Sequence, residues 1–91
     1  MLPILWQTEA QTDLATILAY IAERSQKAAA DLYDEIDHAV SQLPQHPYLY
    51  RPGRVAGTHE MVVHSNYVVV YRVDATAIEI LSVLHTRQQY P

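Results

Sequence analysis

Cysteine is absent from this chain of 91 residues, and no apolar run approaches the roughly 20 residues that are needed to span a bilayer. Without cysteine the chain can form no disulfide, no thiolate metal site and no cysteine nucleophile. The N-terminus also lacks the basic region and long apolar stretch of an export signal. These absences favour a soluble, cytoplasmic protein that makes no contact with a membrane.

Positive charge is scarce, since lysine occurs only once and the formal net charge is −4. Residues 1–45 carry two basic side chains against seven acidic ones, whereas residues 46–91 carry four arginines against three acidic side chains. An anion-facing surface, if the chain has one, is therefore expected in the second half of the sequence.

The first half of the sequence predicts a short strand over residues 3–6, where an early proline suits an edge position, and then two amphipathic helices. Thr8 and Gln11 have the spacing of a capping box ahead of a helix over residues 9–22. Ser25 suits the N-cap of a second helix, whose apolar stripe stops at Pro44. Because the turn between the helices is short, they must lie antiparallel as a hairpin. Its expected core consists of Leu14, Ile17, Ile21, Leu32, Ile36 and Val40.

The second half predicts an irregular connection followed by a three-stranded antiparallel meander. Residues 44–57 hold three of the five prolines and both glycines, so an ordered loop is expected there. Runs rich in Val, Ile, Tyr and Thr over residues 58–63, 67–73 and 77–84 predict strands. Of the turns at residues 64–66 and 74–76, the first contains Asn66, which suits a left-handed conformation. The expected fold class is α+β, with an N-terminal strand and an antiparallel helical hairpin packed on an antiparallel β-sheet in one domain.

The strand over residues 67–73 has two largely apolar faces and should therefore be central. Alternation places Val68, Val70 and Arg72 on one face and Tyr67 and Tyr71 on the other. The helical hairpin can cover one face only. The other face needs the loop, the C-terminal tail or a partner chain, because an exposed apolar patch of several hundred Å² is a liability for a monomer.

Several segments, taken in order, resemble the RelE/ParE superfamily of bacterial type II toxins, and more closely its ParE branch. The resemblance covers nearly the whole chain and implies the same α+β fold. The segments that carry it are WQTEA at residues 6–10, Asp13-Leu14, Tyr20-Ile21-Ala22, Ala28-Ala29, Ala39-Val40 with Leu43, His46-Pro47, Gly53-Arg54, GTHEMVV at 57–63, YVVVYRV at 67–73 and VLHTRQQYP at 83–91.

The resemblance implies a growth-inhibiting toxin that is encoded beside an antitoxin, and the antitoxin partner would cover its apolar and basic surface. ParE-like members are regarded as poisons of DNA gyrase, and RelE-like members cut messenger RNA on the ribosome. The family often has arginine at the position of His59, so an anion-binding role carried over to this position is in doubt.

Cleavage of RNA through its 2′-hydroxyl needs a base, an acid and cations that stabilise the phosphoryl oxygens. The end of the chain could supply a catalytic set of His85, Arg87 and Tyr90. In this set the imidazole acts as general base or general acid, and the phenol ring of Tyr90 stacks on a nucleobase of the RNA. The residues predicted to bind the target are Arg54, His59, Arg72 and Arg87.

Each of these residues also has a structural interpretation. An imidazole at a strand end is often simply hydrogen-bonded, Arg72 in a central strand can pair with an acid, and Tyr90 can pack the C-terminus. No two histidines have the i, i+4 spacing of a helical metal motif, so neither a metal site nor a cofactor is expected.

Charge favours gyrase over the ribosome as the target. Lysine and arginine supply most of the non-specific affinity for nucleic acid, and a chain of net charge −4 with a single lysine lacks that attraction. A protein target such as gyrase can be bound through apolar, aromatic and arginine side chains. The sequence therefore favours a gyrase-binding toxin, with a ribosome-dependent nuclease as the alternative and a non-toxic antitoxin-binding module as a third possibility.

Overall fold

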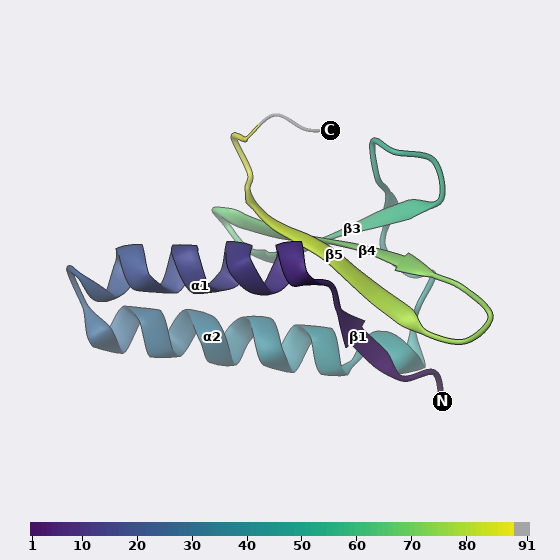
Figure 1. Ribbon diagram of the computed structural model, residues 1–91, viewed down its shortest axis with the longest axis horizontal. Helices are drawn as coiled ribbons and strands as arrows, with labels where there is room; N and C mark the ends of the chain where they lie inside the picture. The colour runs from purple at the N-terminus through teal and green to yellow at the C-terminus, as the bar shows by residue number, and fades with distance from the viewer. Residues whose placement is uncertain (89–91) are drawn as a thin grey trace.

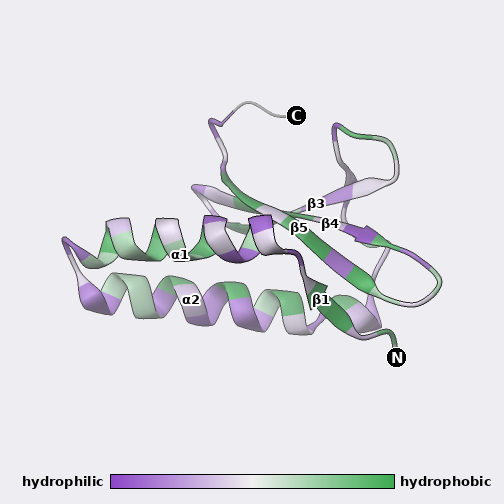
Figure 2. Cartoon of the chain, in the orientation of Figure 1, coloured by the Kyte–Doolittle hydropathy of each residue, from purple (hydrophilic) through white to green (hydrophobic). Residues whose placement is uncertain are grey.

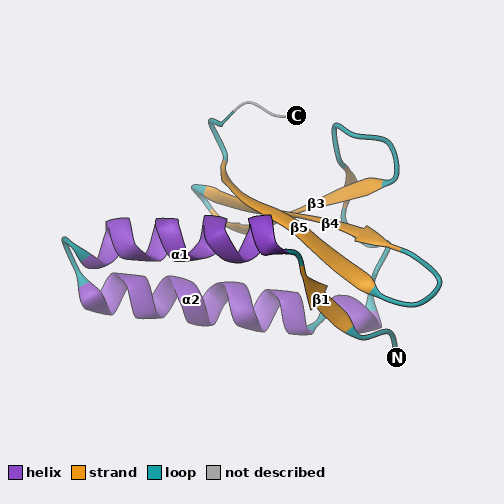
Figure 3. Cartoon of the chain, viewed as in Figure 1, coloured by secondary structure: helices purple, strands orange, loops and turns teal. Residues whose placement is uncertain are grey.

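In a computed structural model of the protein, which describes residues 1–88, two antiparallel helices pack against one side of a five-stranded sheet (Figures 1 and 3). The sheet order is β1-β5-β4-β3-β2. This arrangement confirms the predicted α+β fold. The elements are β1 (Ile4–Trp6), α1 (Thr8–Ala22), α2 (Gln26–Ser41), the 3₁₀ helix η1 (Leu43–Gln45), β2 (Arg51–Pro52), β3 (Thr58–His64), β4 (Tyr67–Val73) and β5 (Ile78–His85).

The antiparallel meander is as predicted, but the sheet as a whole is mixed and not antiparallel, because β1 pairs with β5 in parallel while the other neighbours pair antiparallel. The long crossover through the two helices and the meander brings β1 beside β5, the last strand of the chain. As predicted, β4 is the central strand. The two-residue strand β2 was not predicted, and Pro52 is tolerated there because β2 is an edge strand.

The capping box predicted for α1 is wrong. Gln7 is the N-cap, with an extended backbone and no capping side-chain hydrogen bond, and its backbone N–H donates to the carbonyl of Ile80 in the sheet at 2.9 Å. The side chain of Gln11 donates instead to the carbonyl of Trp6 at 2.9 Å. Strand β1 therefore runs into α1 with almost no connection. The N-cap predicted for α2 is confirmed, since the hydroxyl of Ser25 accepts the backbone N–H of Ala28 at 3.1 Å.

The two turns of the meander are held by side chains. The left-handed conformation predicted for Asn66 is wrong, because no described residue other than glycine has a positive φ. The N–H of Asn66 donates to His64 Nδ1 at 3.1 Å, beside a register shift between Val62 and His64. In the second turn, hydrogen bonds from Thr76 and then from the N–H of Ala77 lower the pKa of Asp74.

The main core lies between the helices and the sheet. Of the residues predicted to build it, Leu32, Ile36 and Val40 on α2 are buried, whereas Leu14, Ile17 and Ile21 on α1 are only partly buried. Figure 2 shows β1 and β5 mostly in the hydrophobic colour, whereas the colours of α2 alternate along its length. Because its apolar residues are only partly buried, helix α1 leaves part of its own apolar surface exposed.

The opposite face of the sheet carries a second, smaller apolar cluster of Val68, Val70 and Leu84. These side chains are 3 to 6% exposed within the single chain. The partner expected on this face is therefore not needed to bury them. Val62 on the same face is 53% exposed, and Tyr48 and Leu49 in the loop after η1 are more exposed still.

Tyr71 links that loop to the centre of the sheet. Its side chain is completely buried, and its hydroxyl donates to the carbonyl of Pro47 at 2.8 Å. Burial, with a smaller contribution from Tyr50, raises the pKa of Tyr71 to about 12. The loop over residues 46–50 is thus tied to β4 at a fixed point.

Replacing Tyr71 by Phe should lower the free energy of unfolding by about 1 kcal/mol, because the ring stays and only the hydrogen bond is lost. Since the folded state keeps the phenol protonated up to about pH 12 while the unfolded state ionises near 10.0, this contribution should decline as the pH rises through that window. Denaturant unfolding at pH 7, 10 and 11.5 measures both effects. Tyr48→Phe, at a residue 70% exposed, is the control, and equal stability of the two variants at every pH would contradict the assignment.

Candidate functional site

Three aromatic side chains form a row across the sheet at the end of β5. His64, Tyr67 and His85 pair in register on β3, β4 and β5. The ring centroids of both histidines lie within 6 Å of the Tyr67 ring, at 5.9 Å for His64 and 5.4 Å for His85. This row is the setting of His85, the residue predicted to act as base or acid.

The imidazole of His85 is already engaged in the turn that follows β5. The backbone N–H of Arg87 donates to His85 Nδ1 at 3.1 Å. Because Nδ1 accepts, the neutral ring carries its proton on Nε2. In this arrangement Nε2 is a donor, and neither nitrogen has a free lone pair with which to take a proton from a hydroxyl.

A groove of about 390 Å³ separates α1 from this end of β5. Its lining consists of Asp13, Thr16, Ile17, Tyr20, Tyr67, Val83, His85 and Gln88. Asp13 was not predicted as a site residue, although the sequence shows an acid directly beside the apolar stripe of α1. Its Oδ2 accepts the backbone N–H of Val83 at 3.0 Å, close to the register shift of β5 opposite Val70 and Tyr71. The carboxylate therefore holds the strand that ends in His85.

Arg72 lies on the opposite face of the sheet from His85, as the alternation along β4 requires. Its guanidinium is 3.2 Å from Glu79 Oε2, and Glu79 Oε1 accepts the side chain of Gln7 at 2.7 Å. Arg72 therefore pairs with an acidic side chain, as its structural interpretation expects. A partly exposed ion pair of this kind contributes about 1 kcal/mol or less to the free energy of unfolding.

His59 supports the loop after η1. Its ring stacks on Tyr71 with centroids 5.3 Å apart, and its Nδ1–H donates to the carbonyl of Tyr50 at 3.1 Å. It lies opposite Tyr71 in the register, roughly 13 Å along β4 from the position opposite His85. A histidine at this position thus packs and hydrogen-bonds on the helical side of the sheet.

The two remaining described residues of the predicted set are exposed and lie at different ends of the meander. Arg54 is in the loop that leads into β3, and Arg87 is in the turn after β5. Tyr90 lies outside the described residues. The structure therefore brings His85 and Arg87 together and places Arg72 and His59 apart from them, so the roles of all these residues stay predictions.

Within residues 1–88 no group of three or more His, Asp or Glu side chains could hold a metal ion. Over the same part of the chain, neither helix has the length and hydrophobicity to cross a membrane. The end of β5 offers hydrogen-bond donors and a row of aromatic rings.

Comparison with known proteins identifies the relatives of this chain. Residues 4–90 match the family model described as ParE toxin of type II toxin-antitoxin system, parDE. A relative from Sinorhizobium fredii (strain NBRC 101917 / NGR234), named "Putative toxin Y4kP", is 38% identical over 89 residues, which are 97% of this chain and 92% of that protein.

Solved structures share the fold. A structure of the chromosomal ParDE system of P. aeruginosa aligns with a TM-score of 0.81 and 24% identity, over 93% of this chain and 96% of that one. The YoeB/ParE toxin of Agrobacterium tumefaciens aligns with a TM-score of 0.68 and 14% identity, over 98% and 100%. A chain of the DinJ-YafQ complex of E. coli aligns with a TM-score of 0.66 and 10% identity, over 93% of each chain.

Replacing Asp13 by Ala should destabilise the fold by about 1 to 3 kcal/mol, because the backbone N–H of Val83 loses its acceptor. Asp13→Asn keeps a side-chain oxygen and should lose less. Urea unfolding of both variants, with Thr12→Ala on the exposed side of α1 as the control, measures the difference. Losses no larger than that of Thr12→Ala would show that the hydrogen bond does not stabilise the fold.

Proposed function

This chain belongs to the ParE toxin family of type II toxin-antitoxin systems, and we propose that it inhibits growth by binding DNA gyrase in the bacterial cytoplasm. The observation that carries the proposal is the engagement of His85. Its Nδ1 accepts the N–H of Arg87 at 3.1 Å, which leaves the best candidate for a general base without a free lone pair. Binding to a protein target needs no such base.

The position of Arg72 also supports binding over RNA cleavage. Arg72 points away from the face that carries His85 and is paired with Glu79 at 3.2 Å. Cations that stabilise a phosphoryl group must lie within hydrogen-bond distance of it, and therefore close to the base as well. A net charge of −4 adds no long-range attraction to ribosomal RNA.

A cognate antitoxin is the second partner that we propose. Structural relatives of this chain include a ParDE system and a DinJ-YafQ complex, and these support a toxin that is held by a protein partner. We assign the antitoxin to the groove of about 460 Å³ between α1 and α2, which is lined mainly by apolar side chains. Asp37 lies on its edge and the helical half of the chain is acidic, so an amphipathic segment with basic residues fits it.

Induction of the protein in a bacterium that lacks the antitoxin should cause filamentation and DNA damage, and the purified protein should inhibit gyrase supercoiling. Arg87→Ala should weaken both effects without changing the melting temperature, because the side chain is exposed. Equal potency of this variant would remove Arg87 from the target-binding set.

Two other outcomes of the same experiment would contradict gyrase binding. Rapid loss of translation, with cleaved messenger RNA, would identify a RelE-like ribosome-dependent nuclease. Unaffected growth, with the antitoxin still bound, would identify a non-toxic antitoxin-binding module.

Filling the helical groove should weaken antitoxin binding alone. Ala15 is exposed and lines the groove, so Ala15→Arg adds bulk and positive charge without disturbing the core. We expect antitoxin affinity, measured by calorimetry, to fall roughly tenfold or more, with growth inhibition retained. Ala30→Arg, at an exposed position of α2 outside the lining, is the control, and equal affinities of the two variants would place the antitoxin elsewhere.

A further inference from the structure

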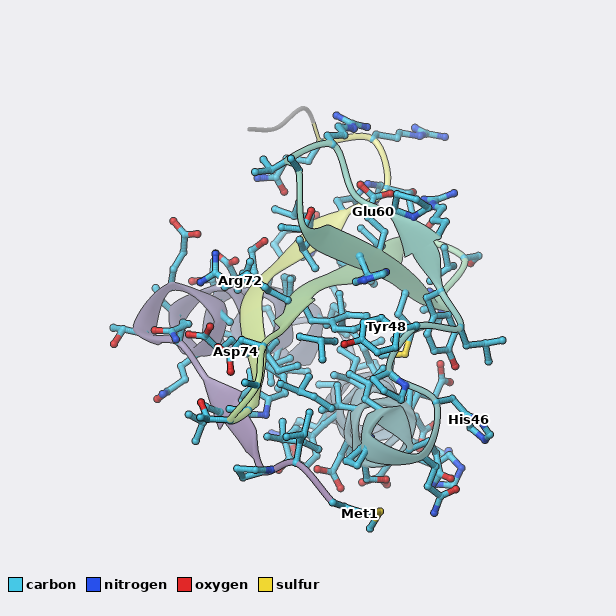
Figure 4. All side chains as sticks on the ribbon, turned by 90° about the vertical axis from the view of Figure 1, so that its right-hand side faces the viewer. Met1, His46, Tyr48, Glu60, Arg72 and Asp74 are labelled. Atoms are coloured by element: carbon cyan, nitrogen blue, oxygen red, sulfur yellow. The ribbon has the colours of Figure 1, made fainter. Side chains whose placement is uncertain are left out.

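Two neighbouring apolar side chains project from the loop over residues 46–50. Tyr48 is 70% exposed and Leu49 is 68% exposed, and within residues 1–88 only Met1 among the large hydrophobic side chains is more exposed. Figure 4 faces the end of the molecule where Tyr48 and His46 lie. Single exposed apolar residues are common on protein surfaces, but an adjacent pair on a loop needs a reason.

The loop that carries this pair is fixed from several sides. Its anchors in the sheet are the hydrogen bonds from Tyr71 to the carbonyl of Pro47 and from His59 to the carbonyl of Tyr50, at 2.8 and 3.1 Å. The ring of Tyr48 meets His59 edge-on with centroids 5.8 Å apart. The backbone N–H of Leu49 donates to the carbonyl of His46 at 3.2 Å. A loop held in this way loses little conformational entropy when a partner binds it.

Charge indicates what kind of partner this loop fits. Residues 38–59 contain no acidic side chain, and they include Arg51 and Arg54, which are both exposed. Arg51 is paired through its Nε with the nearly buried Glu60 at 3.0 Å, and its side chain is still 61% exposed. The helical half, residues 1–45, carries seven acidic side chains against two basic ones. The exposed apolar pair therefore belongs to the basic part of an otherwise acidic molecule, and an acidic surface complements it.

We propose that residues 47–50 are the apolar anchor through which this toxin docks onto an acidic surface of the protein that it inhibits. This inference rests on the proposed function, and it adds the docking surface and the chemistry of the partner. Tyrosine and arginine are among the residues most enriched in positions that dominate binding energy, and Tyr48 and Arg51 lie within two residues of Leu49 here. A protein is favoured over nucleic acid because phosphates gain nothing from contact with Leu49, and two arginines attract them only weakly.

The test compares Leu49→Asp with Leu49→Lys. Lysine keeps an aliphatic stem and adds the charge that an acidic surface attracts, whereas aspartate removes the apolar contact and repels that surface. Val62→Asp, at a residue 53% exposed on β3, is the matched control. Each variant is measured for growth inhibition on induction, for binding to DNA-free gyrase, for antitoxin affinity and for melting temperature.

The proposal predicts that Leu49→Asp reduces the binding of the target roughly tenfold or more and relieves growth inhibition. Leu49→Lys should lose clearly less, and Val62→Asp should behave like the unmodified protein. Antitoxin affinity and melting temperature should be unchanged in the two variants at position 49.

Four results would overturn the proposal. Leu49→Asp could inhibit growth as fully as the unmodified protein. Both substitutions at position 49 could weaken growth inhibition equally, which would show that the partner surface is not acidic. A matching loss of antitoxin affinity would assign the loop to the antitoxin, and binding that requires DNA would assign it to nucleic acid.

Failure of gyrase as the target can be distinguished from failure of the docking surface. Growth inhibition that depends on Leu49 without any effect on gyrase would support the docking surface and exclude gyrase as the target. An unmodified protein that inhibits nothing would contradict both.

Discussion

The completely buried side chain of Tyr71 is the constraint on which the rest of the structure depends. Its ring packs in the core between the central strand and the helices, while its hydroxyl reaches the carbonyl of Pro47 at 2.8 Å. A buried phenol must find a hydrogen-bond partner, and this one finds it in a loop that has no regular structure of its own. One side chain thus joins the core of the domain to the surface that we assign to the target.

His59 extends that link. Its ring lies on Tyr71 and meets Tyr48 edge-on, and its Nδ1–H donates to Tyr50. His59 is therefore used here to support the loop through its ring and its Nδ1–H.

Most of the fold could be predicted from the sequence because periodicity and turn residues act locally. The apolar stripes of the helices, Ser25 and the turn at Asp74 fixed the elements. The features that could not be predicted are long-range ones. The N–H of Gln7, just before α1, donates to the carbonyl of Ile80 far along the chain, and the parallel pairing of β1 and β5 needs the whole crossover.

The candidate site was less predictable for the same reason. The sequence places His85, Arg87 and Arg72 in the second half, but the strand alternation and the turn after β5 decide where they point. The hydrogen bond from a backbone N–H to His85 Nδ1 cannot be inferred from the residue types in the sequence. Tyr48 and Leu49 look like ordinary loop residues until Tyr71 and His59 are seen to hold them in place.

The central claim is that a rigid loop tied to the core, and not the far face of the sheet, meets the target. Methyl NMR of the toxin labelled at Leu and Val, titrated with unlabelled DNA-free gyrase, tests it most directly. The methyl signals of Leu49 should broaden first, while those of Val62 and Leu84 on the far face stay sharp. Broadening of Val62 and Leu84 with an unchanged Leu49 signal would contradict the claim.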